Sequence, residues 1–352
     1  MDYNLLEKIS KIYKGLQDEV SKKIFFKRLQ YSLSSDEGII SEMVYEEMMR
    51  CKDTDIMMSL LLEIEKTEQP IIIWGAGFAG HQIANMLEYM GRKAECFVDN
   101  NSNLWGKVCC GLEIRAPKSI KDTTKYFIII GTNYFVAEIH RELMGMGIAE
   151  ENIFVPDKQW WIGNEPQYFD SEIMHPDKNE CFVDGGSFDG ENTLEFISWC
   201  AGNFSAVYMF EPDKENYLRI KTLAEKDNKI LAFERGLWSD TTVLRFSSRV
   251  RETSTISDKG DVEIKVTSID EILNGKPVTF IKLDIEGSEM EAIKGAEKTI
   301  KLYKPKLAIC VYHKPEDIID IPLKILEMNP SYKLFLRHYS YLQTETVLYA
   351  VE

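Results

Sequence analysis

Two glycine-rich turns, one in each half of this 352-residue chain, constrain its fold more than any other feature. Residues 71–80 read IIIWGAGFAG, and residues 181–190 read CFVDGGSFDG. In both, an apolar stretch runs into closely spaced glycines and then into a helical pattern. That order of strand, glycine turn and helix is typical of the first turn of a doubly wound α/β domain. The chain is therefore expected to contain two such domains.

The two turns differ in charge, which indicates that they bind different ligands. A pyrophosphate is bound by bare backbone N–H groups, and a nearby anion weakens that binding. The second turn carries two carboxylates, Asp184 and Asp189. Such a turn favours a cationic or polyhydroxyl ligand, so we expect it to bind a nucleotide of another kind.

Hydrophobic periodicity divides the chain into four parts. Apolar residues recur at helical spacing through residues 1–68, which are expected to form a helical N-terminal region. Strand patterns alternate with helical ones over residues 69–156 and again over residues 179–352, which predicts two mostly parallel sheets. Residues 157–178 contain several prolines and tryptophans without a clean period, and we expect a linker there.

The expected strands of the first domain lie at 71–74, 94–98 and 126–130, and those of the second at 181–184, 206–210, 230–233, 279–283, 306–311, 333–337 and 346–350.

Composition excludes several classes of protein. Lys and Arg number 42 against 57 Asp and Glu, so the net charge of -15 argues against nucleic acid as a partner. We find no basic leader and no membrane-length apolar run, and we expect a cytoplasmic protein. The seven cysteines are odd in number, and several lie inside apolar strands. They predict a reducing compartment, with neither a disulfide framework nor a zinc site.

In doubly wound sheets, ligands bind at the carboxyl ends of the strands. Four carboxylates follow expected strands of the second half: Asp184, Glu211, Asp284 and Glu286. An acid at the end of the second strand is suited to a ribose diol, which it binds through two hydrogen bonds. The predicted site is thus rich in carboxylates and poor in cations.

Three motifs make residues 179–352 resemble the FkbM family of S-adenosylmethionine-dependent O-methyltransferases. They are VDGGSFDG at 183–190, FEPD at 210–213 and KLDIEGSE at 282–289, and the likeness extends to VTSIDEIL at 266–273 and ICVYH at 309–313. The resemblance implies a class I methyltransferase fold, S-adenosylmethionine as cofactor and a hydroxyl as methyl acceptor. Together with the first domain, it favours a small-molecule or saccharide substrate: a sugar, a glycan precursor or a related metabolite.

The resemblance also assigns residues to the cofactor. The loop after the first strand would cradle the methionine part of the cofactor, and the acid after the second strand would hold its ribose hydroxyls. The residues so assigned are Asp184, Gly185, Gly186, Phe188, Asp189, Gly190, Glu211 and Pro212. An independent physical argument agrees, because neighbouring carboxylates stabilise a sulfonium cation.

Methyl transfer to an alcohol requires alignment of the acceptor with the sulfonium and removal of a proton. Asp284 is the first candidate for contact with the acceptor or with its base, and His313 is the second. Glu286 is a candidate to orient the base or a substrate hydroxyl. An ordinary buried or loop histidine is the alternative for His313, and His338, which follows KLFLR at a similar strand end, stays open as another candidate. No residue spacing demands a metal, so none is expected, although the carboxylates near His313 leave a divalent cation open.

The first turn has the G-x-G-x-x-G spacing of a dinucleotide site, formed by Gly75, Gly77 and Gly80, and Asp99 closes the next strand where a ribose-binding acid belongs. DNNSNLWGK at 99–107 resembles the Rossmann-like nucleotide or nucleotide-sugar domains attached to sugar-modifying enzymes.

Three interpretations of this first domain stay open. It binds a nucleotide sugar, it binds a dinucleotide, or it serves packing or contacts in a homo-oligomer. Two alternative functions follow for the chain. One is an NAD(P)-dependent oxidoreductase or epimerase that uses the first turn, and the other is a non-catalytic nucleotide-binding protein.

Overall fold

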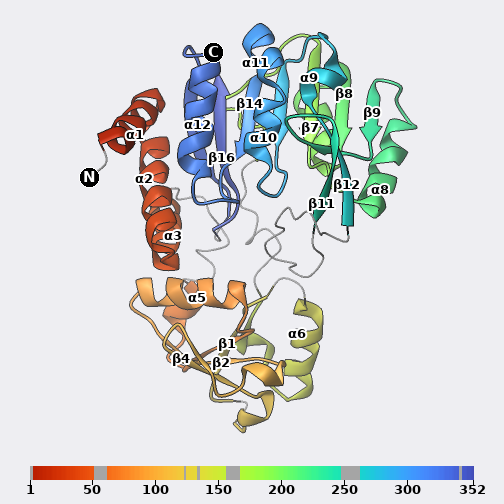
Figure 1. Cartoon of the computed structure of the whole chain (residues 1–352). Coiled ribbons are helices and arrows are strands. Elements are labelled where there is room, and N and C mark those ends of the chain that lie inside the picture. Colours follow the sequence, from red (N-terminus) through yellow and green to blue (C-terminus); the bar gives the residue numbers. More distant parts are fainter. Residues whose placement is uncertain are drawn as a thin grey trace. The chain divides into compact units, whose positions relative to one another are not determined.

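The computed structural model describes residues 3–50, 62–122, 124–132, 135–155, 167–246, 262–340 and 343–352. The chain divides into two compact units, and each contains its own sheet with covering helices (Figure 1). Unit 1 comprises Met1–Phe26, Pro166–His338 and Glu345–Glu352, and unit 2 comprises Lys27–Glu165 and Tyr339–Thr344. The expected boundary at residue 68 is therefore not the division between the units, because residues 1–26 belong with unit 1.

Unit 1 is built on a seven-stranded sheet with the order β15-β16-β14-β13-β7-β8-β9. Its strands are β7 (Glu180–Gly185), β8 (Phe204–Phe210), β9 (Ile230–Phe233), β13 (Phe280–Leu283), β14 (Lys306–Cys310), β15 (Lys333–His338) and β16 (Thr346–Val351). All seven strands predicted for the second half are thus present. They could be recognised because strands buried on both faces read as apolar runs.

The order and direction of the strands determine at which edge of the sheet a ligand site is expected. β7, β8, β9, β13 and β14 run parallel to one another, whereas β16 is antiparallel to both β14 and β15. From β7 the chain proceeds outward through β8 and β9, then returns to add β13 on the other side of β7. Such a reversal opens a crevice between the carboxyl ends of the two central strands. Here those ends are Gly185 of β7 and Leu283 of β13, which are paired in register.

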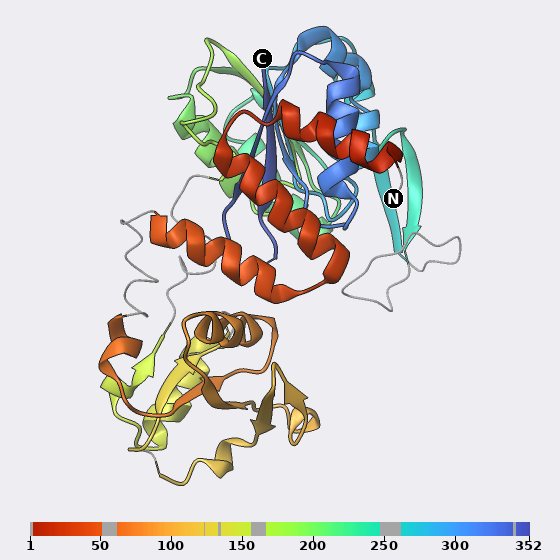
Figure 2. The ribbon, with the colours of Figure 1, turned by 90° about the vertical axis from the view of Figure 1, so that its left-hand side faces the viewer.

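Helices connect the strands of unit 1: α7 (Glu191–Trp199), α8 (Lys214–Ala224), α9 (Ile269–Leu273), α10 (Glu289–Lys294), α11 (Glu297–Tyr303) and α12 (Asp317–Met328). A small second sheet has the order β10-β12-β11, with β10 (Gly236–Leu237), β11 (Thr242–Phe246) and β12 (Val262–Thr267). Helix α1 (Tyr3–Gly15) lies beside α12 (Figures 1 and 2). Immediately after α1, Leu16 forms a β-bridge with Leu334 of β15.

Residues 167–178, expected to be part of a linker, instead pack into unit 1. Tyr168, Phe169 and Met174 are each at most 3% exposed. The Phe169 ring packs edge-on against Phe280 of β13, with their centroids 5.7 Å apart. This segment therefore contributes to the core, and the rest of the expected linker, residues 157–166, lies outside the described residues.

Unit 2 contains a six-stranded sheet with the order β3-β4-β2-β1-β5-β6. The strands are β1 (Ile71–Trp74), β2 (Ala94–Val98), β3 (Val108–Cys109), β4 (Leu112–Arg115), β5 (Phe127–Ile130) and β6 (Ile153–Phe154). All pair in parallel except the β3–β4 hairpin. The three strands predicted for this half are β1, β2 and β5.

Alternate residues of β1 point to opposite faces of this sheet, as the two-residue period of a strand requires. Ile71 and Ile73 pack in a cluster with helix α5 (Phe78–Tyr89), whereas Ile72 and Trp74 pack in another with helix α6 (Val136–Gly145). The sheet is thus covered on both faces. Helices α2 (Glu19–Ser34) and α3 (Glu37–Arg50) precede it, and α3 contacts α5.

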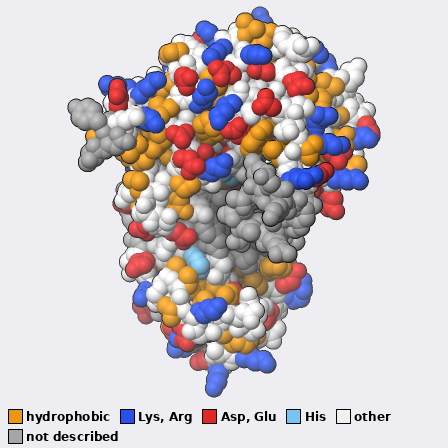
Figure 3. All heavy atoms as spheres, in the orientation of Figure 1, with side chains coloured by type: hydrophobic (Ala, Val, Ile, Leu, Met, Phe, Trp, Pro, Cys, Tyr) orange, Lys and Arg blue, Asp and Glu red, His pale blue; other side chains and the backbone are white. Residues whose placement is uncertain are grey.

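On the face drawn in Figure 3, acidic and basic side chains are interspersed over each unit. None of the helices within the described ranges combines the length and the apolar character needed to cross a bilayer.

Candidate active site

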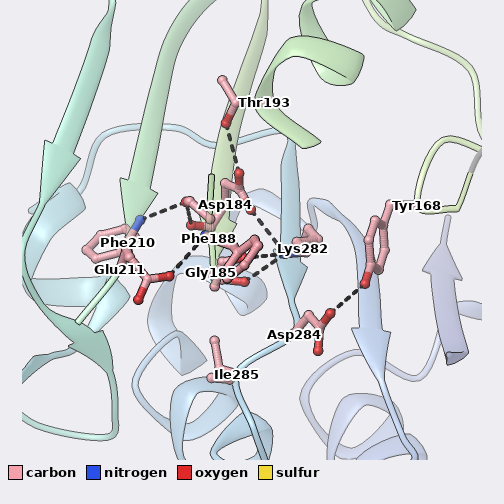
Figure 4. A network of polar contacts seen from close by, with 12 residues as sticks. Tyr168, Asp184, Gly185, Phe188, Thr193, Phe210, Glu211, Lys282, Asp284 and Ile285 are labelled. Carbon is pink, nitrogen blue, oxygen red and sulfur yellow. Dashed lines mark hydrogen bonds and ion pairs between the residues drawn. The ribbon is translucent and has the colours of Figure 1, made fainter. Parts of the chain in front are cut away.

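A buried ion pair lies beneath the second glycine turn. Lys282 of β13 and Asp184 of β7 are both fully buried, and Lys282 Nζ lies 3.3 Å from Asp184 Oδ1 (Figure 4). The same ammonium donates hydrogen bonds to the carbonyl oxygens of Gly185 and Gly186, at 3.1 and 2.8 Å. Thr193 Oγ1 donates to Asp184 Oδ2 at 2.8 Å. Lys282 of β13 therefore holds the second glycine turn in place through these polar contacts.

These contacts revise the role expected for Asp184. The sequence placed its carboxylate at the cofactor, but its side chain is enclosed and is occupied by Lys282 and Thr193. Asp184 thus positions the loop instead of facing a ligand. Burial by itself lowers the pKa of Lys282, yet the carboxylates of Asp184 and Asp284 outweigh it and hold that pKa above its usual value. The lysine stays charged, as an ion pair at this depth requires.

Gly186 lets the turn approach the end of β13. Its φ is +76°, and a Cβ at this position would lie 1.8 Å from the carbonyl oxygen of Asp284. A Cβ on Gly185 would lie 2.7 Å from Leu283 Cδ2. Both glycines are therefore required by the packing of the loop itself, and this packing sets the width of the crevice.

Glu211, which follows β8, is tied to the same loop. Its Oε2 accepts a hydrogen bond from the Phe188 N–H at 3.0 Å, and its Oε1 accepts one from the Asp213 N–H at 2.9 Å. Burial raises the pKa of Glu211, while these two N–H donors act against the rise. Phe188 has a φ of +48° and a side chain that is 57% exposed. The acid predicted for the ribose is thus fixed beside an exposed aromatic ring.

Of the remaining residues expected at the cofactor, Asp189 and Pro212 are exposed and Gly190 is buried. Asp189 is exposed, and its Oδ1 accepts a hydrogen bond from the Glu191 N–H at the start of α7. Gly190 is the N-cap of that helix, with a φ of +89°. Pro212 is exposed next to Glu211.

Asp284 follows β13 and is the centre of a second polar cluster. Tyr168 donates its hydroxyl to Asp284 Oδ2 at 2.9 Å (Figure 4), and Tyr312 donates to Oδ1 at 3.2 Å. Burial would raise the pKa of Asp284, but the positive charges of Lys282 and His313 outweigh burial and lower it. Asp284 is therefore a stable carboxylate.

His313 is held by acids at both ring nitrogens. Its Nδ1 lies 3.0 Å from Oε1 of the fully buried Glu289, and its Nε2 lies 3.6 Å from both Asp284 Oδ1 and Glu286 Oε2. Burial lowers the pKa of His313, but these three carboxylates raise it to about 9. The imidazole is thus protonated at neutral pH in the absence of a ligand. The three expected catalytic residues, Asp284, Glu286 and His313, do come together.

Three further residues of this region were not assigned from the sequence. Lys282 could have been recognised as a charge inside an apolar strand, which requires a buried partner. Tyr168 carried no signal, because its contact with Asp284 spans 116 positions. Glu345 precedes β16, lies 3.4 Å from the Tyr312 hydroxyl and accepts a hydrogen bond from Gln167 Nε2 at 2.5 Å. Burial and the charge of Asp284 raise the pKa of Glu345.

The second cluster also has groups of the kind that bind cations. One ligand atom each from Asp284, Glu289 and His313 lies within 4.8 Å of the others. Glu289 Oε2 is buried and has no hydrogen-bond partner among the described residues. The arrangement thus suits either a bound cation or a positively charged cofactor.

The first glycine turn, in unit 2, is tightly packed. Gly75 has a φ of +116°, and a Cβ on Gly80 would lie 2.0 Å from the Gly75 carbonyl oxygen. Around Gly77, by contrast, a Cβ would meet nothing within 4 Å. Asp99, after β2, accepts a hydrogen bond from the Ala76 N–H at 2.8 Å. The structure thus brings the four residues predicted for this turn to one end of the sheet.

Comparison with protein families decides the class of unit 1. Residues 184–343 match the family described as the methyltransferase FkbM domain. This part of the chain is an FkbM methyltransferase domain. Residues 67–154 match a second family, described as C2185-like, N-terminal. A comparison with curated proteins gives no significant match.

Solved structures include a match at the level of the fold. The methyltransferase FkbM from Methylobacillus flagellatus KT is 21% identical, with a TM-score of 0.51, over 89% of this chain and 100% of that one. Fibrillarin from Aeropyrum pernix, solved with natively bound S-adenosyl-L-methionine, is 12% identical, with a TM-score of 0.32, over 50% of this chain and 67% of that one. UDP-D-quinovosamine 4-dehydrogenase from Vibrio fischeri is 23% identical, with a TM-score of 0.21, over 25% of this chain and 78% of that one. Only the first of these likenesses identifies a fold, and it is that of a methyltransferase.

Proposed function

We propose that the FkbM domain transfers a methyl group from S-adenosylmethionine to a hydroxyl group of a small molecule. One observation carries the proposal: two clusters of acidic residues lie at the carboxyl ends of neighbouring strands in one sheet. The loop 184–190 and Glu211 lie at the ends of β7 and β8, and Asp284 lies at the end of β13 (Figure 4). His313 follows β14 and lies 3.6 Å from Asp284. The first cluster suits the nucleoside of the cofactor, and the second suits the sulfonium and the methyl acceptor.

The charges of this region favour the cofactor. Each oxygen of Glu211 already accepts one N–H, and a carboxylate oxygen has capacity for a second donor, so a ribose diol has acceptors available. The sulfonium carries a positive charge, which the surrounding carboxylates stabilise. Lys282 does not oppose it strongly, because its ammonium is buried against Asp184 and the two glycine carbonyls.

The reaction is an in-line displacement. The oxygen of the acceptor forms a bond to the methyl carbon while the bond from that carbon to the sulfonium sulfur breaks, and the sulfur keeps the electron pair as a neutral thioether. The hydroxyl proton passes to a base of the enzyme. Alignment of the acceptor supplies much of the rate, and proton removal supplies the rest.

We assign the base to His313 Nε2. Glu289 holds the opposite nitrogen, so Nε2 is the one directed at Asp284 and Glu286. In the free enzyme the pKa of about 9 keeps this nitrogen protonated. A sulfonium bound among the same carboxylates adds a positive charge and lowers that pKa, since like charges disfavour one another. Cofactor binding thus prepares the base, and Asp284 orients it.

The test is methyl transfer from radiolabelled S-adenosylmethionine to a pool of monosaccharides, nucleotide sugars and simple alcohols. Replacing the base, His313→Gln, should lower the rate by about 10²- to 10⁴-fold while cofactor affinity is retained. His338→Gln is the matched control, because His338 lies at the end of β15, where its Nδ1 is 2.8 Å from Thr346 Oγ1. Equal rates for the two variants would contradict the assignment.

The sugar class of the acceptor stays a prediction, based on the first domain and on the sequence resemblance. The oxidoreductase alternative, based on the first glycine turn, and the binding-protein alternative also stay predictions.

A further inference from the structure

Outside the FkbM domain, three side chains with metal-binding atoms converge in unit 2. His81 Nε2 lies 3.0 Å from Cys109 Sγ, and Cys109 Sγ lies 4.0 Å from Cys110 Sγ. One ligand atom from each of the three residues lies within 4.8 Å of the others. We propose that His81, Cys109 and Cys110 form a binding site for a divalent transition metal, zinc in the first place.

Two of the three distances between the ligand atoms are close to those around one tetrahedral ion. With zinc–sulfur bonds of about 2.3 Å and zinc–nitrogen bonds of about 2.0 Å, two sulfurs on one ion are about 3.8 Å apart, and a sulfur and a nitrogen are about 3.5 Å apart. The observed 4.0 and 3.0 Å differ from these values by no more than about half an ångström. The third pair, His81 and Cys110, has ligand atoms within 4.8 Å of each other, so binding one ion requires the three side chains to adjust toward it.

The turn of the β3–β4 hairpin has positive φ angles at both of its residues. Val108 pairs with Glu113 and Cys109 with Leu112, so Cys110 and Gly111 form a two-residue turn. Their φ angles are +49° and +67°. Asn, Asp and Gly are the residues that favour such a turn, and a cysteine in this left-handed conformation costs free energy.

This conformation has a consequence for the two sulfurs. Consecutive residues of a regular strand point to opposite faces. The turn at Cys110 instead brings its Sγ to within 4.0 Å of that of Cys109. The strained residue is thus the one that completes a pair of thiols, which ordinary packing of small apolar side chains does not require.

The third ligand comes from a different element. His81 lies in the first turn of α5, and its backbone N–H donates to the Gly77 carbonyl oxygen at 3.1 Å. Helix α5 and the hairpin residues pack in one apolar cluster, which Cys109 and Cys110 border. Two packed elements therefore hold the three ligands, which gives the site the support that a metal needs.

The ligand set indicates the chemistry. Two thiolates and one imidazole suit zinc, and they balance the charge of a divalent ion. With three protein ligands, a fourth position stays open for water or for an oxygen of a bound molecule, as in catalytic zinc sites. The sequence predicted no zinc site, because the cysteines are odd in number and several lie inside apolar strands; Cys109 and Cys110 are adjacent and form no C-x-x-C motif.

The test uses the full chain, purified under reducing conditions without metal and titrated with Co(II). Thiolate-to-cobalt charge-transfer absorption that saturates at one equivalent, and that Zn(II) abolishes by competition, is the expected result. His81→Ala and Cys109→Ser should each weaken Co(II) binding by at least about tenfold. The matched control His140→Ala, in α6 beside Glu150, should bind as the wild type does.

A second measurement uses only the wild-type chain and therefore does not depend on whether the variants fold. Zn(II) should protect two thiols of the wild-type chain from alkylation, and mass spectrometry should locate them at positions 109 and 110. Absence of the cobalt band in folded, reduced protein, or protection of other cysteines instead, would overturn the proposal. Neither readout depends on methyl transfer, so failure here is distinct from failure of the function proposed for unit 1.

Discussion

Lys282 shows how one buried charge organises the residues around it. Its ammonium links Asp184 with the carbonyls of Gly185 and Gly186. Replacing it, Lys282→Met, leaves an unpaired carboxylate in the interior and should lower the free energy of unfolding by about 3–5 kcal/mol. Urea denaturation measures the loss. The control is Lys301→Met, which removes an exposed lysine paired with Glu297 and should have little effect. Similar losses in both variants would show that the buried pair has no special role.

The protonation of His313 gives a prediction for pH dependence. If its imidazole is the base, only the deprotonated form of the free enzyme is active. Because the pKa is raised to about 9 in the free enzyme, kcat/KM for S-adenosylmethionine should rise with pH across the neutral range and level off only above pH 9. The pKa of Asp284 is lowered, so a mechanism with Asp284 as the base would give a flat profile over the same range. A flat profile measured on the wild type would refute the assignment to His313.

At the scale of elements, the turn between β7 and α7 is predicted to tolerate no side chain at position 186. Gly186→Ala places a Cβ 1.8 Å from a carbonyl oxygen, so the loop must move away from β13. The variant should lose most of its affinity for S-adenosylmethionine and unfold at lower urea. Gly202→Ala is the matched control, because Gly202 has a similar φ of +74° but open space around it. In Gly202→Ala, backbone strain alone should lower the free energy of unfolding, by about 1–2 kcal/mol, and the cofactor should bind normally. Equal affinities in the two variants would contradict the account.

The same scale shows which features were readable from the sequence. Most of the predicted strands, β1, β2, β5, β7, β8 and β13 among them, are apolar runs that end at or just before a glycine or an acid. The short strands β3, β4, β6, β10 and β11 were missed, because strands of two to five residues at or near the edge of a sheet carry little pattern. Asp184 was correctly placed at a strand end, but its role depends on Lys282, which lies on another strand, and on Thr193, which lies on the next helix. Tyr168 reaches Asp284 only through the fold, so no local pattern could reveal it.

At the scale of the whole molecule, the chain has two units, and each presents a glycine turn with an acid after the next strand. In unit 2 that acid is Asp99, which accepts from the Ala76 N–H, and in unit 1 it is Glu211, which accepts from the Phe188 N–H. The two acids are thus alike in local geometry. They differ in their surroundings, because only Glu211 shares its sheet edge with the cluster of Asp284, Glu289 and His313.

Calorimetric titration of S-adenosylmethionine into three proteins tests most directly which turn binds the cofactor. The wild type and Asp99→Asn should bind one equivalent with the same affinity, whereas Glu211→Gln should bind at least about tenfold more weakly, since it replaces a charged acceptor of the ribose hydroxyls. Loss of binding in Asp99→Asn with retention in Glu211→Gln, or no binding by the folded wild type, would contradict the assignment of the cofactor to unit 1.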